Sequence, residues 1–202
     1  MHMPFVLTAD QIDSRRHGDL VDATLTQLAS VRTRRPFLRT VGDELQGLLG
    51  EPASVVDAIL ILMRAEQWHI GLGLGPVTEP VPAETRSARG PAFLCARSAV
   101  EEAKGESSHL RLIAAREFDH EATDAETVLR LLAAVRSRRT AAGWQAVDLV
   151  REGRTHGEVS ATLGITRQAV GQRLQAAQWS VEEATIPTLG RLLARAEQVA
   201  SL

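Results

Sequence analysis

A glycine-broken helical segment near the C-terminus constrains the fold of this chain more than any other feature. Thr155 and Glu158 have the spacing of a capping box, in which a hydroxyl and a carboxylate satisfy free backbone N–H groups where a helix begins. Gly164 follows one short helix later, where a left-handed residue allows a tight turn. Thr166 is a suitable N-cap for the next helix, from Arg167 to Ala177. The segment therefore predicts two short helices joined by a tight turn.

The apolar residues of this segment fall on one side of both predicted helices. They are Val159, Leu163, Ile165, Val170 and Leu174. Together with a preceding helix from Gly143 to Arg151, they predict a small tri-helical core. The residues left on the outer side of the second helix are Arg167, Gln168, Gly171, Gln172 and Gln175. Arginine and glutamine can make paired hydrogen bonds with guanine and adenine edges in the major groove, so this face is suited to reading DNA.

The string from Gly164 to Leu174, GITRQAVGQRL, resembles the helix-turn-helix of sigma-factor region 4 and related bacterial regulators. The resemblance implies a helix-turn-helix over residues 155–177 that binds double-stranded DNA. The DNA-binding residues it implies are Thr155, Thr166, Arg167, Gln168, Gln172, Arg173 and Gln175. The alternative is a plain helical hairpin with a glycine turn and no DNA-binding role.

Charge supports the DNA-binding interpretation locally and not for the chain as a whole. The 202 residues carry a net charge of −2, but the stretch from Arg136 to Trp179 holds seven arginines and three acidic residues. A local basic zone is expected where a protein contacts phosphates. No apolar run approaches the ~20 residues of a membrane span, and the single cysteine excludes an internal disulfide. With no export signal recognised, we expect a cytoplasmic protein without a membrane partner.

The first half of the chain alternates strand and helix patterns. Expected strands are 4–9, 37–41, 45–49, 68–74 and 109–116, and expected helices are 19–31, one from Pro52 onward, and 91–104. This order predicts an α+β domain of ferredoxin-like βαββαβ type, with helices covering one face of an antiparallel sheet. An amphipathic helix follows from Asp124 to Arg139, with Leu131 among its inward residues. We therefore expect two domains, an α+β domain over 1–118 and an all-α domain over 119–202.

Two acidic positions stand at the ends of predicted strands. Asp10 ends the first strand, and Asp43 lies in the Gly42-Asp43-Glu44 turn. In a βαββ unit the end of the first strand lies beside the hairpin that follows, so the two carboxylates could converge. Carboxylate oxygens suit a hard divalent cation, and we expect Mg²⁺ or Mn²⁺ as the possible cofactor. Such ions orient and neutralise a triphosphate.

These strings resemble the palm domain of class III nucleotidyl cyclases and GGDEF diguanylate cyclases. The matching segments are Ala9–Ile12, Arg39–Leu45, His69–Gly75 and Gly90–Arg97. The resemblance implies a nucleotide ligand, with Arg97 at the position of a phosphate-contacting arginine. The ligand-binding residues it implies are Gln11, Ile12, Ser14, Arg15, Gly42 and Arg97. Phe93 stands where these cyclases have an asparagine, and Arg39 replaces a base-reading lysine, which argues against turnover.

Residues 4–118 also resemble the SatD family, small bacterial proteins with the successive patterns GD-x-I-x-SR, GDE-x-QG-x-L, G-x-G-x-G and GPA-x-x-x-AR. All four patterns occur here in order, with Ala9 in place of the first glycine. The leading interpretation is a dimeric DNA-binding transcriptional regulator whose cyclase-like domain senses a nucleotide-type ligand or serves for dimerisation. The alternative is a metal-dependent nucleotidyl cyclase or transferase regulated by its C-terminal helices. Arg15 and Arg97 either hold phosphate or pair with Asp13 and Glu101.

Overall fold

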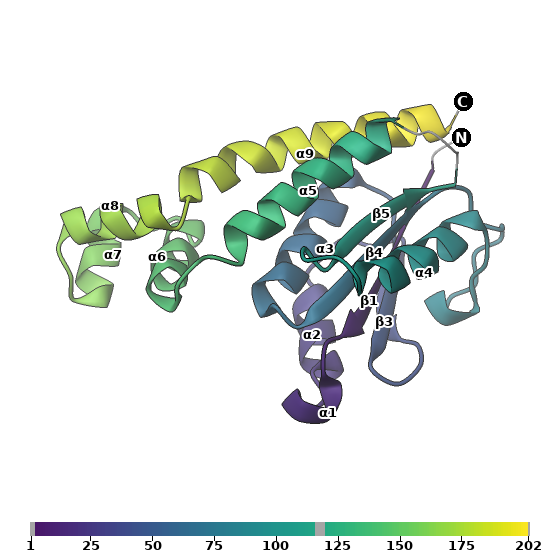
Figure 1. Ribbon diagram of the computed structural model, residues 1–202, viewed down its shortest axis with the longest axis horizontal. Helices are drawn as coiled ribbons and strands as arrows, with labels where there is room; N and C mark the ends of the chain where they lie inside the picture. The colour runs from purple at the N-terminus through teal and green to yellow at the C-terminus, as the bar shows by residue number, and fades with distance from the viewer. Residues whose placement is uncertain (1–2, 116–119, 202) are drawn as a thin grey trace. The chain divides into compact units, whose positions relative to one another are not determined.

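The computed structural model describes residues 3–115 and 120–201 (Figure 1). The chain divides into two compact units. The first unit holds the chain up to Arg130 together with the stretch from Thr188 onward, and the second holds Leu131–Pro187. The expected boundary between 118 and 119 falls on residues outside those described. None of the described helices is both long and apolar enough to cross a membrane.

The first unit contains a five-stranded mixed sheet. The strands are β1 (Phe5–Gln11), β2 (Arg35–Arg39), β3 (Glu44–Leu49), β4 (Trp68–Leu74) and β5 (Leu110–Ala114). Their order across the sheet is β2-β3-β1-β4-β5. Neighbouring strands are antiparallel except β4 and β5, which are parallel. The α+β class is confirmed, but the expectation of an antiparallel sheet was wrong because a helix connects β4 to β5, and such a crossover delivers a parallel strand.

The helices of the first unit follow the strands in an alternating order. They are α1 (Ser14–His17), α2 (Val21–Leu28), α3 (Pro52–Ala65), the 3₁₀ turn η1 (Thr85–Ser87), α4 (Pro91–Ala103) and the first part of α5 (His120–Arg136). The end of α9 (Trp179–Ala200) also belongs to this unit. The element order β1-α1-α2-β2-β3-α3-β4 therefore contains the expected βαββαβ succession.

Both faces of the sheet are covered, contrary to the expectation of one. Helix α4 crosses one face and lies against β4, β5 and β1 (Figure 1). It approaches so closely that a Cβ on Gly71 or Gly73 would overlap its backbone. Side chains alternate along a strand, so Ile70 and Leu72 point to the opposite face, where both are buried. Helix α3 contacts β3 and β4.

Helix α5 protects the exposed edge of β5. The Glu126 carboxylate accepts the Leu112 N–H at 3.2 Å and pairs with Arg111 at 2.6 Å. The apolar stripe of this helix differs from the expected one, since Leu131 is 62% exposed whereas Leu129 is buried. The expectation that Leu131 points inward was wrong. The buried row of this helix, with members three residues apart, contains Leu129 and Leu132.

The second unit is entirely helical where it is described. It holds the end of α5, then α6 (Ala141–Arg151), α7 (His156–Leu163), α8 (Arg167–Ala176) and the start of α9. Helices α6, α7 and α8 contact one another in every pairing. Their shared core contains Trp144, Val147, Val159, Val170 and Leu174, all buried.

A buried ion cluster ties the second unit together. Glu182, near the start of α9, is fully buried and pairs with Arg136, Arg139 and Arg151. Arg139 also donates to the Ala177 carbonyl, where α8 ends, through Nε at 3.0 Å and Nη2 at 2.8 Å. The Arg136 and Arg139 guanidinium groups lie 4.8 and 4.2 Å from the centre of the Trp144 ring in α6. One carboxylate on α9 therefore binds arginines from α5, α6 and the segment between them, and Arg139 links this cluster to the end of α8.

Removing that carboxylate should uncouple these helices. The Glu182→Gln substitution leaves buried guanidinium groups without their counter-charge, which typically costs about 3–5 kcal/mol. Glu183 is the matched control because it is the exposed neighbour, and Glu183→Gln should change the unfolding free energy by less than about 0.5 kcal/mol. Urea unfolding followed by circular dichroism measures both. Equal stabilities of the two variants would contradict a central role for Glu182.

Candidate nucleic-acid interface and ligand pocket

The sequence-predicted caps of the helix-turn-helix are all formed. Thr155 and Glu158 make the full capping box at α7, with the Thr155 N–H donating to the Glu158 carboxylate at 2.7 Å. Gly164 is left-handed at φ 64° and ends α7. The Thr166 hydroxyl accepts the Ala169 N–H at 3.1 Å and caps α8. These caps are made by residues three or four positions apart, so each of them is local in the sequence.

The polar side of α8 is open to solvent. Arg167, Gln168, Gln172 and Gln175 are exposed, and a Cβ on Gly171 would meet nothing within 4 Å. The apolar side holds Val170 and Leu174 against the tri-helical core. The division of α8 into a packed side and a free polar side is the arrangement a recognition helix requires.

Two further contacts shape this surface. A Cβ on Gly157 would lie 3.1 Å from Arg167 Nη2, so the glycine leaves room for the Arg167 side chain beside α7. Arg173 is half-buried, with Nη1 3.5 Å from Gln145 Oε1 in α6. Sequence reasoning missed Gly157, although a glycine in the first turn of a helix is a signal of close approach.

The basic zone is smaller than the sequence suggested. Arg136 and Arg139 are buried and pair with Glu182, so neither can reach a phosphate. Burial lowers the pKa of Arg136 to about 10, which still leaves it charged at neutral pH. The second unit holds seven arginines and five acidic residues in total. Its exposed arginines include Arg138, Arg154 and Arg167.

In the first unit, the ends of β1 and the β2–β3 hairpin meet as expected. The Gln11 N–H donates to the Asp43 carbonyl at 3.3 Å, and Asp10 stands opposite Glu44 in the strand register. The Asp10 carboxylate, however, pairs with Lys104 at 3.0 Å. Across the described part of the chain, no three His, Cys, Asp or Glu side chains are grouped to hold a metal ion. The divalent cation at Asp10 and Asp43 stays a prediction, and no chemical step below uses it.

Several residues expected to bind ligand make contacts within the chain. The Gln11 amide donates to the Gly18 carbonyl at 2.6 Å and accepts the Leu20 N–H at 2.9 Å, which fixes the loop after β1. The Ile12 N–H donates to Gln67. Gly42 is left-handed at the hairpin tip, and its carbonyl accepts from Arg39. Arg39 also pairs with Asp19, so it is not free to read a base.

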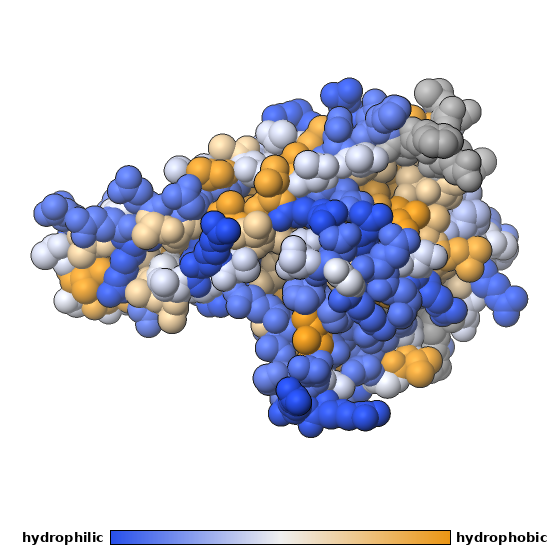
Figure 2. All heavy atoms as spheres, viewed as in Figure 1, coloured by the Kyte–Doolittle hydropathy of each residue, from blue (hydrophilic) through white to orange (hydrophobic). Residues whose placement is uncertain are grey.

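Ser14 and Arg15 lie in the four-residue helix α1. Figure 2 shows this end of the first unit as strongly hydrophilic surface, and Arg15 is exposed there. No ion pair joins Arg15 to Asp13 in the part of the chain that the structure describes, so that alternative finds no support. Arg97, in α4, likewise does not pair with Glu101, whose carboxylate binds Lys104 at 2.8 Å.

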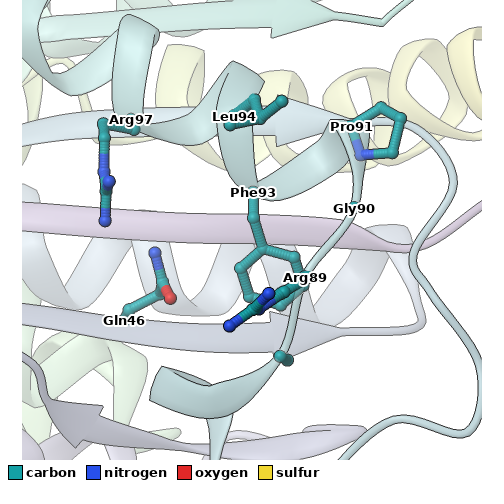
Figure 3. A pocket seen from close by; sticks show the side chains of 8 residues that line it. Gln46, Arg89, Gly90, Pro91, Phe93, Leu94 and Arg97 are labelled. Atoms are coloured by element: carbon teal, nitrogen blue, oxygen red, sulfur yellow. The ribbon is translucent and has the colours of Figure 1, made fainter.

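Arg97 instead lines a pocket of about 480 Å³ between α4 and β3 (Figure 3). The other lining residues are Gln46, Ala88, Arg89, Gly90, Pro91, Phe93 and Leu94. The side chains of Arg89 and Arg97 both extend toward the hollow beside Gln46 (Figure 3). Sequence reasoning missed Arg89 and Gln46, because the loop before α4 has no periodicity that would place it over β3. The volume of the pocket is in the range of small-molecule binding sites.

A histidine pair lies on the same sheet, at the Asp10 end. The Nδ1 atoms of His69 and His109 are 3.2 Å apart, and the rings meet edge to face. Burial lowers the pKa of His69, and His109 and Lys104 lower it further, while Asp10 and the Ala103 carbonyl oppose the shift. His69 belongs to β4, which lies between β1 and β5 in the sheet.

Comparison with known proteins adds no assignment. No protein-family model matches the chain, and no characterised protein matches it in sequence.

The lowered pKa of His69 has a consequence for stability. The ordinary pKa of a histidine side chain is 6.5. As the pH falls below that value, the unfolded chain binds a proton at His69 before the folded chain does. The unfolding free energy should therefore decrease as the pH falls below about 6.5. His69→Gln should remove this part of the pH dependence, whereas His17→Gln, in exposed α1, should keep it. Denaturation curves at a series of pH values measure the effect, and identical profiles for all three proteins would contradict it.

Proposed function

We propose that this chain is a DNA-binding transcriptional regulator. The observation that carries the proposal is the exposed polar face of α8, held on a capped and well-packed tri-helical core. Arg167 and Gln168 stand in the first turn of α8, which is the part of a recognition helix that contacts base edges. Arg138 is an exposed arginine available for phosphates, whereas the exposed Arg154 pairs with Glu152 at 3.0 Å. The resemblance of residues 164–174 to sigma-factor region 4 supports the same function.

For the first unit we propose a ferredoxin-like domain of the nucleotidyl-cyclase-like type, related to the SatD family. The strand order β2-β3-β1-β4, with α4 and β5 added at one side, supports this assignment. In the proposed regulator this domain senses a nucleotide-type ligand or serves for dimerisation. Regulators with a helix-turn-helix commonly bind as dimers to half-sites about 34 Å apart, and we propose a homodimer.

The DNA-binding proposal is tested by specificity rather than by affinity alone. A binding site is first selected from a random duplex library with the wild-type protein. Arg167→Ala and Gln168→Ala should each lower the preference for that site over random duplex by roughly fivefold to 100-fold, the range of a lost base contact. Mobility shifts at fixed salt measure the preference.

Arg138→Ala is the matched control because it removes an exposed arginine outside α8. It should weaken binding to selected and random duplexes alike and leave their ratio unchanged. If the α8 variants also kept that ratio while remaining folded by circular dichroism, the proposed interface would be wrong.

The second candidate function is a metal-dependent nucleotidyl cyclase or transferase. It is favoured by the contact between Gln11 and Asp43, which brings the Asp10 strand end to the acidic turn. The ion pair of Asp10 with Lys104 opposes it, because a metal would have to displace the ammonium group.

We expect no enzymatic turnover. Incubation of the wild-type protein with each nucleoside triphosphate and Mg²⁺ or Mn²⁺ should release no more pyrophosphate than the Asp10→Asn and Asp43→Asn variants release. A wild-type rate that both substitutions abolish would favour the cyclase over the regulator.

A further inference from the structure

The pocket between α4 and β3 is positively charged and contains no acidic side chain. Its lining includes two arginines, Arg89 and Arg97, while the remaining lining residues are neutral. Such a site carries two positive charges that no carboxylate within the pocket offsets. The charge that complements it is a dianion.

Both guanidinium groups are available for a ligand. Arg89 and Arg97 line the pocket and are exposed, and their side chains make no ion pair or hydrogen bond with any described residue. Arg35 and Arg39 of the same unit are engaged, since Arg35 donates to the Pro82 carbonyl at 2.7 Å and Arg39 pairs with Asp19 at 2.8 Å. Arg89 and Arg97, by contrast, extend into one hollow (Figure 3).

The first N–H groups of α4 are already engaged. The Ala92 N–H donates to the Pro76 carbonyl at 3.2 Å, and the Phe93 N–H donates to the Gly90 carbonyl at 3.0 Å. Pro91 has no N–H. The charged groups of the pocket that can hold an anion are therefore the two arginine side chains, and guanidinium groups bind phosphate oxygens in a paired geometry.

The remaining walls fit an organic body attached to the anion. Gln46 is 6% exposed, and its amide is oriented by a 2.9 Å hydrogen bond with the Thr8 hydroxyl. Phe93, Pro91 and Leu94 form the apolar side of the pocket, and Leu94 is 68% exposed at its rim. A small molecule can thus place its charged group between the arginines and its apolar part along α4.

We propose that this pocket binds a small phosphomonoester directly through Arg89 and Arg97, without a bridging metal ion. A phosphomonoester carries close to two negative charges at neutral pH, which matches the two arginines. The proposal deepens the ligand-sensing part of the proposed function and rests on it. It differs from a metal–triphosphate site because the positive charge comes from the chain itself.

Calorimetry with the full chain tests this in EDTA and again with Mg²⁺. The probes are AMP, GMP, CMP, UMP, ribose 5-phosphate and inorganic phosphate, with the four nucleosides and malate as controls. At least one organic phosphate should bind in EDTA, and Mg²⁺ should not tighten it. Arg89→Gln and Arg97→Gln should each raise the Kd at least about tenfold, as expected when a charge-assisted hydrogen bond is lost.

Arg32→Gln is the matched control. Arg32 is 81% exposed and pairs with Glu51 outside the pocket, so its substitution should leave the Kd unchanged. The proposal is overturned if no phosphorylated probe binds, if binding requires Mg²⁺, if malate binds and the phosphates do not, or if the pocket variants bind like Arg32→Gln. If inorganic phosphate and every organic phosphate bind with equal affinity, the claim that the pocket also recognises the organic body of the ligand is overturned. DNA binding by the ligand-free chain is measured in the separate mobility-shift experiment. A failure of phosphate binding therefore does not decide whether the chain binds DNA.

Discussion

The second unit depends on a single buried carboxylate. Glu182 must balance guanidinium groups from α5, from the segment after it and from α6, and it can do so only if α9 begins at the right place against them. The same arginines contact Trp144 and the end of α8. A buried charge network is costly when incomplete, so its geometry tolerates few alternative packings. The position of α8 on its core is one product of that constraint.

Local signals were enough to predict the helix-turn-helix, because its caps and turn are made by residues three or four apart. Thr155 with Glu158, the left-handed Gly164 and the Thr166 cap are all confirmed. The buried arginines could not be predicted in this way. Arg136 and Arg139 look like solvated cations in a basic stretch, and their partner Glu182 lies more than 40 residues away. Charge counted along a sequence does not reveal which charges are neutralised inside.

The first unit shows a similar limit. Strand β4 was predicted with the observed bounds, and the meeting of β1 with the acidic turn follows from the βαββ order. The pocket was predicted only at Arg97. Arg89 meets Gln46 of β3 there because the chain before α4 folds back over β2 and β3, with Arg35 donating to the Val81 carbonyl and Thr85 donating to the Pro36 carbonyl. These hydrogen bonds join residues that are 46 and 49 positions apart, so no periodic pattern in the sequence indicates them.

Each edge of the sheet carries a feature that hinders the addition of a further strand. On the β5 side, the Glu126 carboxylate occupies the Leu112 N–H that an added strand would need. On the β2 side, Pro36 has no N–H to offer, and its carbonyl accepts from Thr85. Open edges invite association by strand addition and aggregation. A chain protected in this way is expected to self-associate through helical surfaces, and to remain dispersed at concentrations where an unguarded sheet would begin to form fibres.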